Sequence, residues 1–387
     1  MKKAYFDFSS RLQDLQEKSL LRRLREFKPT EGMSALFDGK ESIHFSSNDY
    51  LGLSRHPMVI EGAVKATKEY GTSCSASRLI SGNNPLFSAL ERTVAQWKGK
   101  QKALIFPSGY MAALASVSSL VGKADMILMD SFSHASLWEG ARLSHATLRV
   151  FDHNEPKNLK KLLERYAGDF KKILIITESL FSMDGDIAPL EEIVELKEHF
   201  EAYLLLDDAH AEGILGENGG GLATALDLAD KVDVILGTFS KALGSQGGYV
   251  AAEQSIIDWM INSAKSFIFT TALSPSCVAA AASALDIIQS KEGAMLRRKL
   301  KDNISHFFEE NLANSFFCSP IIPIKIGTES KTIEVSAILE QKGIYLPPIR
   351  YPTVPRGEAR LRISLTAIHR ADQIDYLKEA LKKLGVL

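Results

Sequence analysis

The chain has 387 residues, of which 45% are apolar, and its 46 lysines and arginines nearly balance 47 aspartates and glutamates. The formal net charge of −1 argues against a nucleic-acid-binding or membrane-surface protein, because both draw their affinity from a basic field. The three widely spaced cysteines indicate neither a disulfide framework nor a Cys-x-x-Cys metal site, so we expect no metal and a reducing, cytoplasmic location. The first residues lack the apolar core of a signal peptide, and the alanine-rich run at 277–288 is too short to span a bilayer, so we expect neither export nor a membrane partner.

The first predicted element is a helix near the N-terminus. Leucines recur at helical spacing in SSRLQDLQEKSLLRRLREF, residues 9–27, and Ser9 or Ser10 is suited to be the N-cap. We assign residues 1–47 to an N-terminal arm.

Residues 48–285 alternate short apolar runs with amphipathic helical stretches. Each run is apolar throughout, which is typical of parallel strands that helices bury on both faces. The runs are KALIF (102–106), DMILMD (125–130), KILIITES (172–179), AYLLLDD (202–208) and VDVILGT (232–238). We therefore predict an α/β fold with a mostly parallel central sheet in a large domain at 48–285. The strand-like runs FFCSPIIPIKIG and ARLRISL, which lie between helical stretches, predict a smaller α+β domain at 286–387.

Polar side chains follow three of these runs, where each predicted strand ends. In an open parallel sheet, ligands bind beyond the carboxyl ends of the strands, so one site can collect all of these side chains. They are Ser182, Asp207, His210, Thr238, Ser240 and Lys241.

Three of these residues form a set that pyridoxal phosphate enzymes use. A lysine forms a Schiff base with the aldehyde of the cofactor, and a buried aspartate keeps the pyridine nitrogen protonated, so that the ring acts as an electron sink. Lys241 and Asp207 suit these roles, and His210 follows three residues after the aspartate. Taken alone, the lysine could be a solvated charge, and DDAH could be a turn or one side of a divalent-metal site. The combination favours the cofactor.

Two further motifs support a ligand site. In FPSGYMAALASV, Ser108, Gly109 and Tyr110 follow an apolar run and open a predicted helix, where backbone N–H groups can cradle a phosphate. His134, in SHASLWEGARLS, follows another strand and as a neutral imidazole can lie over the face of a bound ring. The glycines of GENGGGLA and GSQGG do not match the G-x-G-x-x-G pattern after a first strand, which disfavours a dinucleotide site.

The C-terminal run ARLRISL places Arg360, Arg362 and Ser364 on one face of a predicted strand. A guanidinium fork on that face suits a substrate carboxylate. The alternative is a surface strand whose edge is protected by charge.

The chain resembles the α-oxoamine synthases, a branch of the fold-type I pyridoxal phosphate enzymes. The matching motifs occur in the family's order along nearly the whole chain: FSSNDYLGLSRHP, SRLISGNNPLFSALE, PSGYMAA, DSFSHASLWEGARLS, TESLFSMDGDIAPL, LLLDDAHAEGILG, GTFSKALGSQGGY and YPTVPRGEARLRISLTAIH. The resemblance implies a fold-type I transferase with an N-terminal helical arm and a small C-terminal domain. It also implies a homodimer whose active sites lie at the subunit interface.

The resemblance assigns roles to the residues around the cofactor. Lys241 would be the Schiff-base lysine, Asp207 the partner of the pyridine nitrogen and His210 the neighbour of the ring phenolate. His134 would stack on the ring, and Ser182 would lie beside it. The other implied cofactor and phosphate ligands are Ser108, Gly109, Tyr110, Thr238, Ser240 and, from the second subunit, Thr271.

Other implied residues would bind substrates. Asn48 would hydrogen-bond in the active site from across the dimer, and Arg362 would hold the carboxylate of an amino acid. Arg22 falls where the family has an arginine associated with the acyl substrate, and Arg350 and Thr353 lie in its usual PPTVP region, written YPTVP here.

Members of this family condense an amino acid with an acyl thioester and release carbon dioxide and free thiol. The length and FSSNDYLGL most resemble the members that join L-alanine to a pimeloyl thioester, carried on coenzyme A or a carrier protein, in biotin synthesis. Ser77 favours alanine, because aminolevulinate-forming members tend to carry a threonine there and the smaller side chain leaves room for a methyl group. One methyl group contributes only about 1–3 kcal/mol of discrimination between two substrates in an apolar pocket. Cys74, where many relatives have glycine, and Tyr351, which makes RYPTVPRGE also resemble 5-aminolevulinate synthase, are departures.

Three alternatives stay open at this point. A sister synthase that uses glycine or serine is the nearest. An aminotransferase of the same fold would share Lys241 and Asp207 but would not release carbon dioxide and thiol. A binding protein that kept the fold and lost catalysis is the third.

Overall fold

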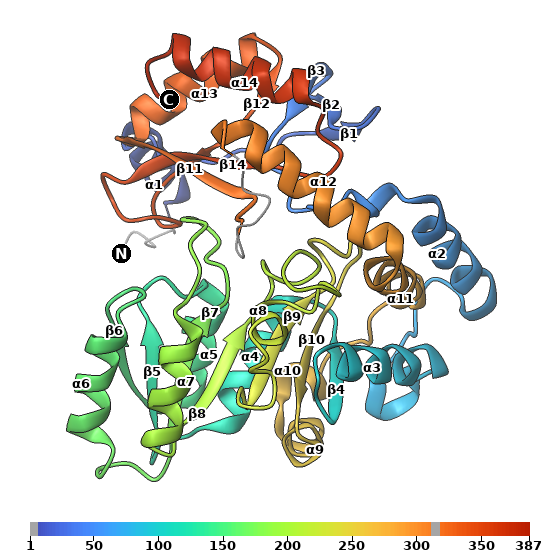
Figure 1. The fold of residues 1–387 in the computed structure, drawn as a ribbon, viewed down its shortest axis with the longest axis vertical. Coiled ribbons are helices and arrows are strands. Elements are labelled where there is room, and N and C mark those ends of the chain that lie inside the picture. Colours follow the sequence, from blue (N-terminus) through green and yellow to red (C-terminus); the bar gives the residue numbers. More distant parts are fainter. Residues whose placement is uncertain (1–6, 311–317) are drawn as a thin grey trace, which may run out of the picture. The chain divides into compact units, whose positions relative to one another are not determined.

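A computed structural model describes residues 7–310 and 318–387, which divide into two compact units (Figure 1). The large unit consists of Asn48–Ser182 and Asp186–Arg298. The small unit joins Met1–Ser47, Met183–Gly185 and Lys299–Leu387. The domain limits expected from the sequence, at 47/48 and 285/286, stay predictions.

The large unit is built on a seven-stranded sheet with the strand order β4-β10-β9-β8-β7-β5-β6. Only β10 runs against the others, because it pairs in antiparallel fashion with both β4 and β9. The predicted mostly parallel sheet is therefore confirmed. The strands are β4 (Lys102–Phe106), β5 (Met126–Asp130), β6 (Thr147–Phe151), β7 (Ile173–Glu178), β8 (Tyr203–Asp207), β9 (Val234–Thr238) and β10 (Gly248–Ala252).

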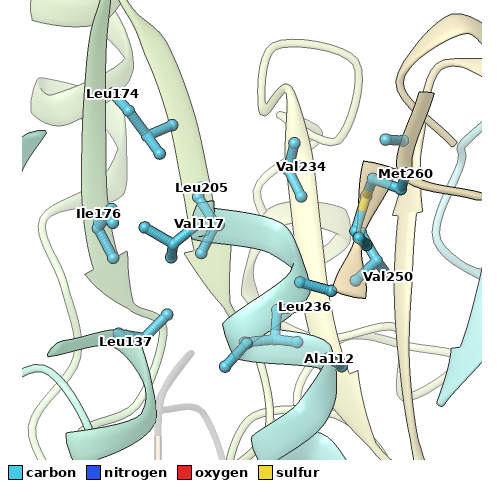
Figure 2. Close-up of a cluster of buried hydrophobic side chains, with 14 of the residues drawn as sticks. Ala112, Val117, Leu137, Leu174, Ile176, Leu205, Val234, Leu236, Val250 and Met260 are labelled. Atoms are coloured by element: carbon cyan, nitrogen blue, oxygen red, sulfur yellow. The ribbon is translucent and has the colours of Figure 1, made fainter. Parts of the chain in front are cut away.

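Helices cover both faces of this sheet. They are α2 (Pro57–Tyr70), α3 (Pro85–Trp97), α4 (Gly109–Leu120), α5 (Ala135–Ser144), α6 (Pro156–Tyr166), α7 (Leu190–His199), α8 (Leu222–Ala225), α9 (Gln254–Ser263), α10 (Lys265–Ile268) and α11 (Pro275–Gln289), with a 3-10 turn η1 (Leu53–Arg55) and a π-turn η2 (Arg78–Gly82). On one face, α4, α5, α9 and α10 bury an apolar cluster against the strands; Figure 2 shows members of it, among them Val117 of α4, Leu205 of β8 and Leu236 of β9. Ile175 lies between two cluster members of β7 and is fully buried outside the cluster, so the other face is covered as well. This two-sided burial is why the strands are apolar throughout.

In its described residues, the small unit contains two sheets and three helices of its own. The first sheet has the order β1 (Phe27–Pro29), β2 (Ser34–Phe37), β3 (Lys40–His44) and β12 (Ile344–Tyr345), and the second has the order β11 (Ile321–Gly327), β14 (Ala359–Ser364) and β13 (Pro348–Ile349). Its helices are α1 (Phe8–Glu17), α13 (Glu329–Gln341) and α14 (Ala371–Lys383), and α12 (Lys291–Phe308) ends in this unit. The predicted strand FFCSPIIPIKIG begins as β11 only at Ile321, and its residues 316–317 lie outside the described residues.

The N-terminal helix is shorter than the leucine spacing predicts, and its cap is a different residue. Asp7 is the N-cap of α1, because its carboxylate accepts a hydrogen bond from the Ser10 backbone N–H at 2.9 Å, so Ser9 and Ser10 lie inside the helix. The helix ends at Glu17, and Ser19 has a φ of 57°, a left-handed conformation that a right-handed helix cannot include. Among all the described helices, none combines the length and the apolar composition that a membrane crossing requires.

Candidate active site

The large unit contains a cavity of about 220 Å³ at the carboxyl ends of β7, β8 and β9 and the N-termini of α4 and α5. An open α/β sheet binds its ligands at this edge. Nine residues that the sequence predicts for the site line the cavity: Ser108, Gly109, Tyr110, His134, Asp207, His210, Thr238, Ser240 and Lys241. Ser136, Glu178, Ala209, Leu236 and Gly237 complete the lining. Motifs that are far apart in the sequence therefore meet in one pocket.

Asp207 is the last residue of β8, and only 7% of it is exposed. Burial raises the pKa of its carboxyl group, and the charge of Lys241 opposes that shift. The Ala209 backbone N–H also donates to Oδ1 at 3.1 Å, which favours the ionised form. A buried carboxylate and a lysine amine thus face the same cavity, which fits the ring nitrogen and the aldehyde of pyridoxal phosphate.

The adjacent Asp208 has a different role. It does not line the cavity; it is fully buried, with Lys98 Nζ at 2.5 Å and the Ser179 hydroxyl donating to it at 2.5 Å. Within residues 7–310 and 318–387, no group of three His, Cys, Asp or Glu side chains is arranged to hold a metal ion. The interpretation of DDAH as one side of a divalent-metal site is therefore wrong for Asp208, which forms a structural ion pair.

His134 is held as a neutral imidazole. It is the N-cap of α5, where its Nδ1 accepts from the Ser136 backbone N–H at 3.3 Å and lies 2.8 Å from Ser136 Oγ. A ring nitrogen that accepts carries no proton, so the neutral ring has its proton on Nε2. Burial lowers the pKa of His134, although the charge of Asp207 opposes this. A neutral ring suits the predicted position against the face of a cofactor.

Tyr50 connects two other predicted residues. Its Oη lies 2.7 Å from His210 Nδ1 and donates to Asn48 Oδ1 at 3.3 Å. A hydroxyl has a single proton, so when it donates to Asn48 it accepts from a protonated Nδ1 of His210. Asn48 does not line the cavity of this chain, but it lies two hydrogen bonds from His210.

The N-terminus of α4 closes another side of the cavity. Ser108 is its N-cap, and a Cβ on Gly109 would lie 3.2 Å from the Cβ and Oγ1 atoms of Thr238, so a glycine allows the helix to begin this close to β9. The Oγ1 atom of Thr238 lies 2.8 Å from Ser240 Oγ and donates to Gly247 O at 2.8 Å. Helix N–H groups and side-chain hydroxyls therefore gather at one place, which fits a phosphate group.

Glu178 is a cavity residue that the sequence analysis missed. It ends β7 as Asp207 ends β8, and the two are register partners in the sheet. Only 2% of Glu178 is exposed, and its carboxyl group accepts the backbone N–H of His134. The signal was present in TES, since a carboxylate at the end of an apolar run is the pattern that singles out Asp207 in LDD.

Besides Asn48, three more predicted residues of the large unit lie outside the cavity lining. Ser77 precedes η2, Ser182 is half-buried after β7, and Thr271 is exposed in the segment that follows α10. An exposed Thr271 is compatible with the expectation that this residue serves a second subunit.

The predicted acyl-substrate residues meet in the small unit. The Arg22 guanidinium is exposed and donates to Tyr351 O at 2.9 Å, and Thr353 follows in the same turn. Arg350 is 9% exposed and donates to the backbone carbonyls of Ser19 and, at 3.3 Å, Leu21. Burial lowers the pKa of Arg350, and the positive charge of Arg22 contributes to the shift. Two guanidinium groups are thus close enough to repel each other.

Arg362 lies on a central strand and not on a sheet edge. β14 lies between β11 and β13, and all six of its residues are buried, so the interpretation of ARLRISL as a charged surface edge is wrong. Arg360 is paired with Asp184 at 2.6 Å and with Glu358 at 2.9 Å. Arg362 donates to Ser364 Oγ at 2.7 Å. Arg360 is therefore held by two carboxylates.

Comparisons with known proteins agree with this geometry. The family model described as aminotransferase class I and II matches residues 40–381. The 8-amino-7-oxononanoate synthase of Trichlorobacter lovleyi is 41% identical over 382 residues, which cover 97% of each chain. The putative 8-amino-7-oxononanoate synthase of Desulforudis audaxviator is 43% identical over 375 residues, or 96% of this chain and 97% of that protein.

Solved structures are similar over the same length. A serine palmitoyltransferase variant from S. paucimobilis with a bound PLP–myriocin aldimine has a TM-score of 0.90 and 28% sequence identity, covering 99% of this chain and 98% of that chain. An 8-amino-7-oxononanoate synthase from Francisella tularensis has a TM-score of 0.74 and 30% sequence identity, and the match covers 89% of this chain and 98% of that chain. The similarity therefore extends over both units and is not confined to a single motif.

Proposed function

Because the chain belongs to the class I and II aminotransferase family and, within it, to the 8-amino-7-oxononanoate synthases of biotin synthesis, we propose that it condenses L-alanine with a pimeloyl thioester. The products would be 8-amino-7-oxononanoate, carbon dioxide and free thiol. The predicted α-oxoamine synthase resemblance, the fold-type I architecture and the acyltransferase class are confirmed by this membership. The observation that carries the proposal is the cavity in which Lys241, Asp207, His134 and His210 meet.

Pyridoxal 5′-phosphate is the cofactor. When bound, it supplies an electron sink for negative charge at the Cα atom of the amino acid. We assign its aldehyde carbon to Lys241 and its ring nitrogen to Asp207. Its phosphate would take the donors at the N-terminus of α4 together with the hydroxyls of Thr238 and Ser240.

The residues of the cavity would divide the proton chemistry among themselves. Lys241 Nζ, once free, would take the proton from Cα, since it is the amine that faces the cavity. Asp207, whose negative charge is favoured by Lys241 and by the Ala209 N–H, would hold a proton on the ring nitrogen that faces it. His134 would cover the ring without adding a second positive charge, and His210, oriented by Tyr50, would face the ring oxygen. Ser182 would lie beside the cofactor.

Two predicted residues would set the choice of amino acid. Arg362 would hold the carboxylate, as the family resemblance implies, because its planar guanidinium fork matches the two oxygens of a carboxylate. Ser77 would leave room for the methyl group of alanine. One methyl group gives only about 1–3 kcal/mol of discrimination, so glycine would be a slower substrate and would still react.

For the distal carboxylate of the acyl chain, we assign Arg22 rather than Arg350. Both terminal nitrogens of Arg350 donate to backbone carbonyls, whereas Arg22 is exposed and gives one of its terminal nitrogens to Tyr351 O. The mutual repulsion of the two guanidinium groups is relieved when an anion binds beside them. Thr353, exposed in the same turn, would contribute a hydroxyl.

The working form would be a homodimer with shared active sites. Tyr110, which lines the cavity, is 46% exposed, and Ile80 and Phe269 are 81% and 80% exposed. Ile80 lies in η2 and Phe269 is the C-cap of α10, and these two elements are in contact, so both side chains belong to one region of the large unit. A second copy that covered this region could present its Thr271 and Asn48 to the site.

Thiol release by the cofactor-loaded protein tests the function directly. Pimeloyl-, acetyl-, succinyl- and palmitoyl-coenzyme A would each be combined with alanine, glycine and serine, and carbon dioxide would be measured alongside. We expect the fastest release with pimeloyl-coenzyme A and alanine, and none from Lys241→Ala. The variant controls for thioester hydrolysis that does not involve the site.

The other outcomes each identify a different protein. Activity with another pair would keep the family and reassign the substrates to those of 2-amino-3-oxobutyrate coenzyme A ligase, 5-aminolevulinate synthase or serine palmitoyltransferase. Amino-group transfer to a keto acid without thiol release would indicate an aminotransferase. Cofactor binding with neither reaction would indicate a binding protein.

A further inference from the structure

Two buried carboxyl groups end neighbouring strands of the cavity, and the proposed chemistry uses only one of them. Glu178 and Asp207 are register partners on β7 and β8, and both line the cavity. Register partners in a parallel sheet project from the same face, and neighbouring strands are about 4.8 Å apart. The second carboxyl, Glu178, is the more deeply buried of the two, with 2% exposed against 7%.

The two carboxyl groups have unequal partners. Asp207 accepts a backbone N–H from Ala209, and Lys241 acts on it more strongly than any other charge. Glu178 accepts the backbone N–H of His134 through one oxygen, while its Oε1 is buried and has no hydrogen-bond partner among residues 7–310 and 318–387. Burying a charged carboxylate oxygen without a hydrogen-bond donor costs more free energy than burying the same oxygen in a neutral carboxylic acid.

We propose that Glu178 is a neutral, proton-holding carboxylic acid that acts as a positioning residue of the active site. Its Oε1 carries the proton, its other oxygen holds the N–H of His134, and Asp207 keeps the negative charge opposite the ring nitrogen. This inference rests on the proposed pyridoxal phosphate function for its catalytic meaning, but not for the protonation state itself.

The charges around Glu178 favour its neutral form. Asp207 and Asp130 both act on it as negative neighbours, and Lys241 is the positive one. Two anions this close in a buried site cannot both be stable when a single cation serves both, so one of them keeps its proton. Burial is the largest cause that raises the pKa of Glu178 well above its usual range, and the charge of Asp207 adds to it.

The consequence for catalysis is electrostatic. A second carboxylate beside Asp207 would stabilise a positive charge on Lys241 and delay its use as a base. A neutral acid avoids this and still accepts the backbone N–H of His134. An amide has the shape of a carboxyl group and no charge, so it can replace a neutral acid but not a carboxylate. Glutamine should therefore substitute for Glu178, whereas asparagine should not substitute for Asp207.

The first test compares Glu178→Gln, Glu178→Leu and Asp207→Asn in the pyridoxal phosphate-loaded protein. The readouts are the dissociation constant of the cofactor and the pH midpoint of its visible absorbance. For Glu178→Gln we expect a dissociation constant within about twofold of wild type and the same midpoint, since the amide is as neutral as the acid and its oxygen still accepts the N–H of His134. Glu178→Leu leaves the His134 N–H without its acceptor and should weaken cofactor binding by about 5- to 100-fold.

A midpoint that moves by about one unit or more to lower pH in Glu178→Gln would overturn the proposal, because that is the effect of removing a negative charge close to a cation. Asp207→Asn is the matched comparison, and its spectrum should change where that of Glu178→Gln does not. If wild type develops no visible band with pyridoxal phosphate, the proposed function fails instead, and this outcome is recognised before any variant is compared.

The second test needs no cofactor. A neutral acid whose pKa is raised by folding stabilises the fold fully below its unfolded value, and that stabilisation is lost as the pH rises toward the folded value. The melting temperature of Glu178→Gln minus that of wild type, both without cofactor, should therefore increase as the pH is raised from about 5 to about 8. A difference that stays flat or decreases over this range would show that Glu178 is ionised in the folded protein, contrary to the proposal.

Discussion

At the scale of single residues, Lys98 is the cation that pairs with the buried carboxyl groups of Asp208 and Glu212. Its Nζ lies 2.5 Å from Asp208 Oδ2, 2.8 Å from Gly220 O and 3.9 Å from Glu212 Oε2. The side chains of the lysine and of both acidic residues are fully buried. Lys98→Met leaves these carboxyl groups without a cation and should lower the free energy of unfolding by about 3–5 kcal/mol. Urea denaturation of the cofactor-free protein measures this change.

Lys102 provides the matched control for that measurement. It forms an ion pair with Asp258 in which the side chains are 39% and 45% exposed, so Lys102→Met should cost no more than about 1 kcal/mol. Equal losses in the two variants would contradict the assignment of Lys98 as the essential cation.

The sequence identifies site residues well where their chemistry and position coincide. Asp207 and Lys241 each lie at the end of an apolar run, and the structure places both in one cavity. Glu178 also ends a run, but its importance depends on β7 lying next to β8, which is a fact of strand order that local sequence does not contain. Lys98, in QWKGK, has the sequence of a surface lysine, because its two acidic partners lie more than 100 residues away.

At the scale of elements, His153 joins the end of β5 to the segment that follows β7. Its Nδ1 lies 2.9 Å from Asp130 Oδ1, and its Nε2 lies 2.6 Å from Asp186 Oδ2. Burial opposes the charged form, but the hydrogen bonds to the two carboxylates outweigh it and raise the pKa of His153 to about 9. The bridge supports the turn that leads from Asp130 to His134 in the cavity.

The stabilisation from His153 should therefore depend on pH with a defined sign. It is fully present below the ordinary histidine value of 6.5 and is lost as the pH rises through about 9. His153→Gln should be less stable than wild type by roughly 1–3 kcal/mol near pH 6, and the difference should shrink by about pH 10. Denaturation at both pH values checks this. A difference that is unchanged between them would mean that ring stacking on Phe132, and not charge, accounts for the loss.

A second element-level prediction concerns the contact between β10 and the start of α4. A Cβ on Gly248 would lie 2.5 Å from Gly109 Cα and 2.6 Å from Gly109 N, so Gly248→Ala must displace the helix N-terminus that we assign to the phosphate. We expect a loss of about 1–3 kcal/mol in stability and a roughly tenfold or larger increase in the dissociation constant of pyridoxal phosphate. Fluorescence titration measures the second effect.

Gly122, just beyond the end of α4, is the control. A Cβ there meets nothing within 4 Å, so Gly122→Ala should bind the cofactor as wild type does. If Gly248→Ala also binds normally, the phosphate does not lie at this helix.

The elements that the sequence misses are those whose pattern is atypical. β10 reads GYVAA after a glycine-rich loop, and it is buried because Tyr249 finds Glu212 as a partner for its hydroxyl, a contact with a residue 37 positions away. α1 is overpredicted because leucine spacing continues past Glu17, whereas the backbone turns at Ser19. Apolar periodicity thus predicts the strands that helices cover. It fails where a local turn sets the end of a helix, as in α1, or where a distant polar partner allows a strand to be buried, as in β10.

At the scale of the whole molecule, the small unit could not be predicted from local patterns. β12 has only two residues, Ile344 and Tyr345, and it pairs in parallel with β3 about 300 positions earlier. The Ser364 N–H also donates to Phe45 O at 2.7 Å, which joins the N-terminal segment to the second sheet. Such pairings depend on the path of the entire chain, so a sequence that reads as an arm at one end and a small domain at the other folds into a single unit.

Assembly is the largest-scale property that the proposed function requires, and its test lies on the exposed apolar region around η2 and α10. Burying Ile80 and Phe269, which are about four-fifths exposed, is favourable only if another surface covers them, and glutamates at both positions would place two charges in that contact. Light scattering should give wild type the mass of two 42.6 kDa chains and the Ile80→Glu/Phe269→Glu variant the mass of one, with thiol release lost together with the dimer. Val150→Glu, at an exposed position on the edge strand β6, is the control and should stay dimeric and active. A monomeric wild type that releases thiol at full rate would show that one chain completes the active site by itself, which contradicts the roles assigned to Thr271 and Asn48 of a second subunit.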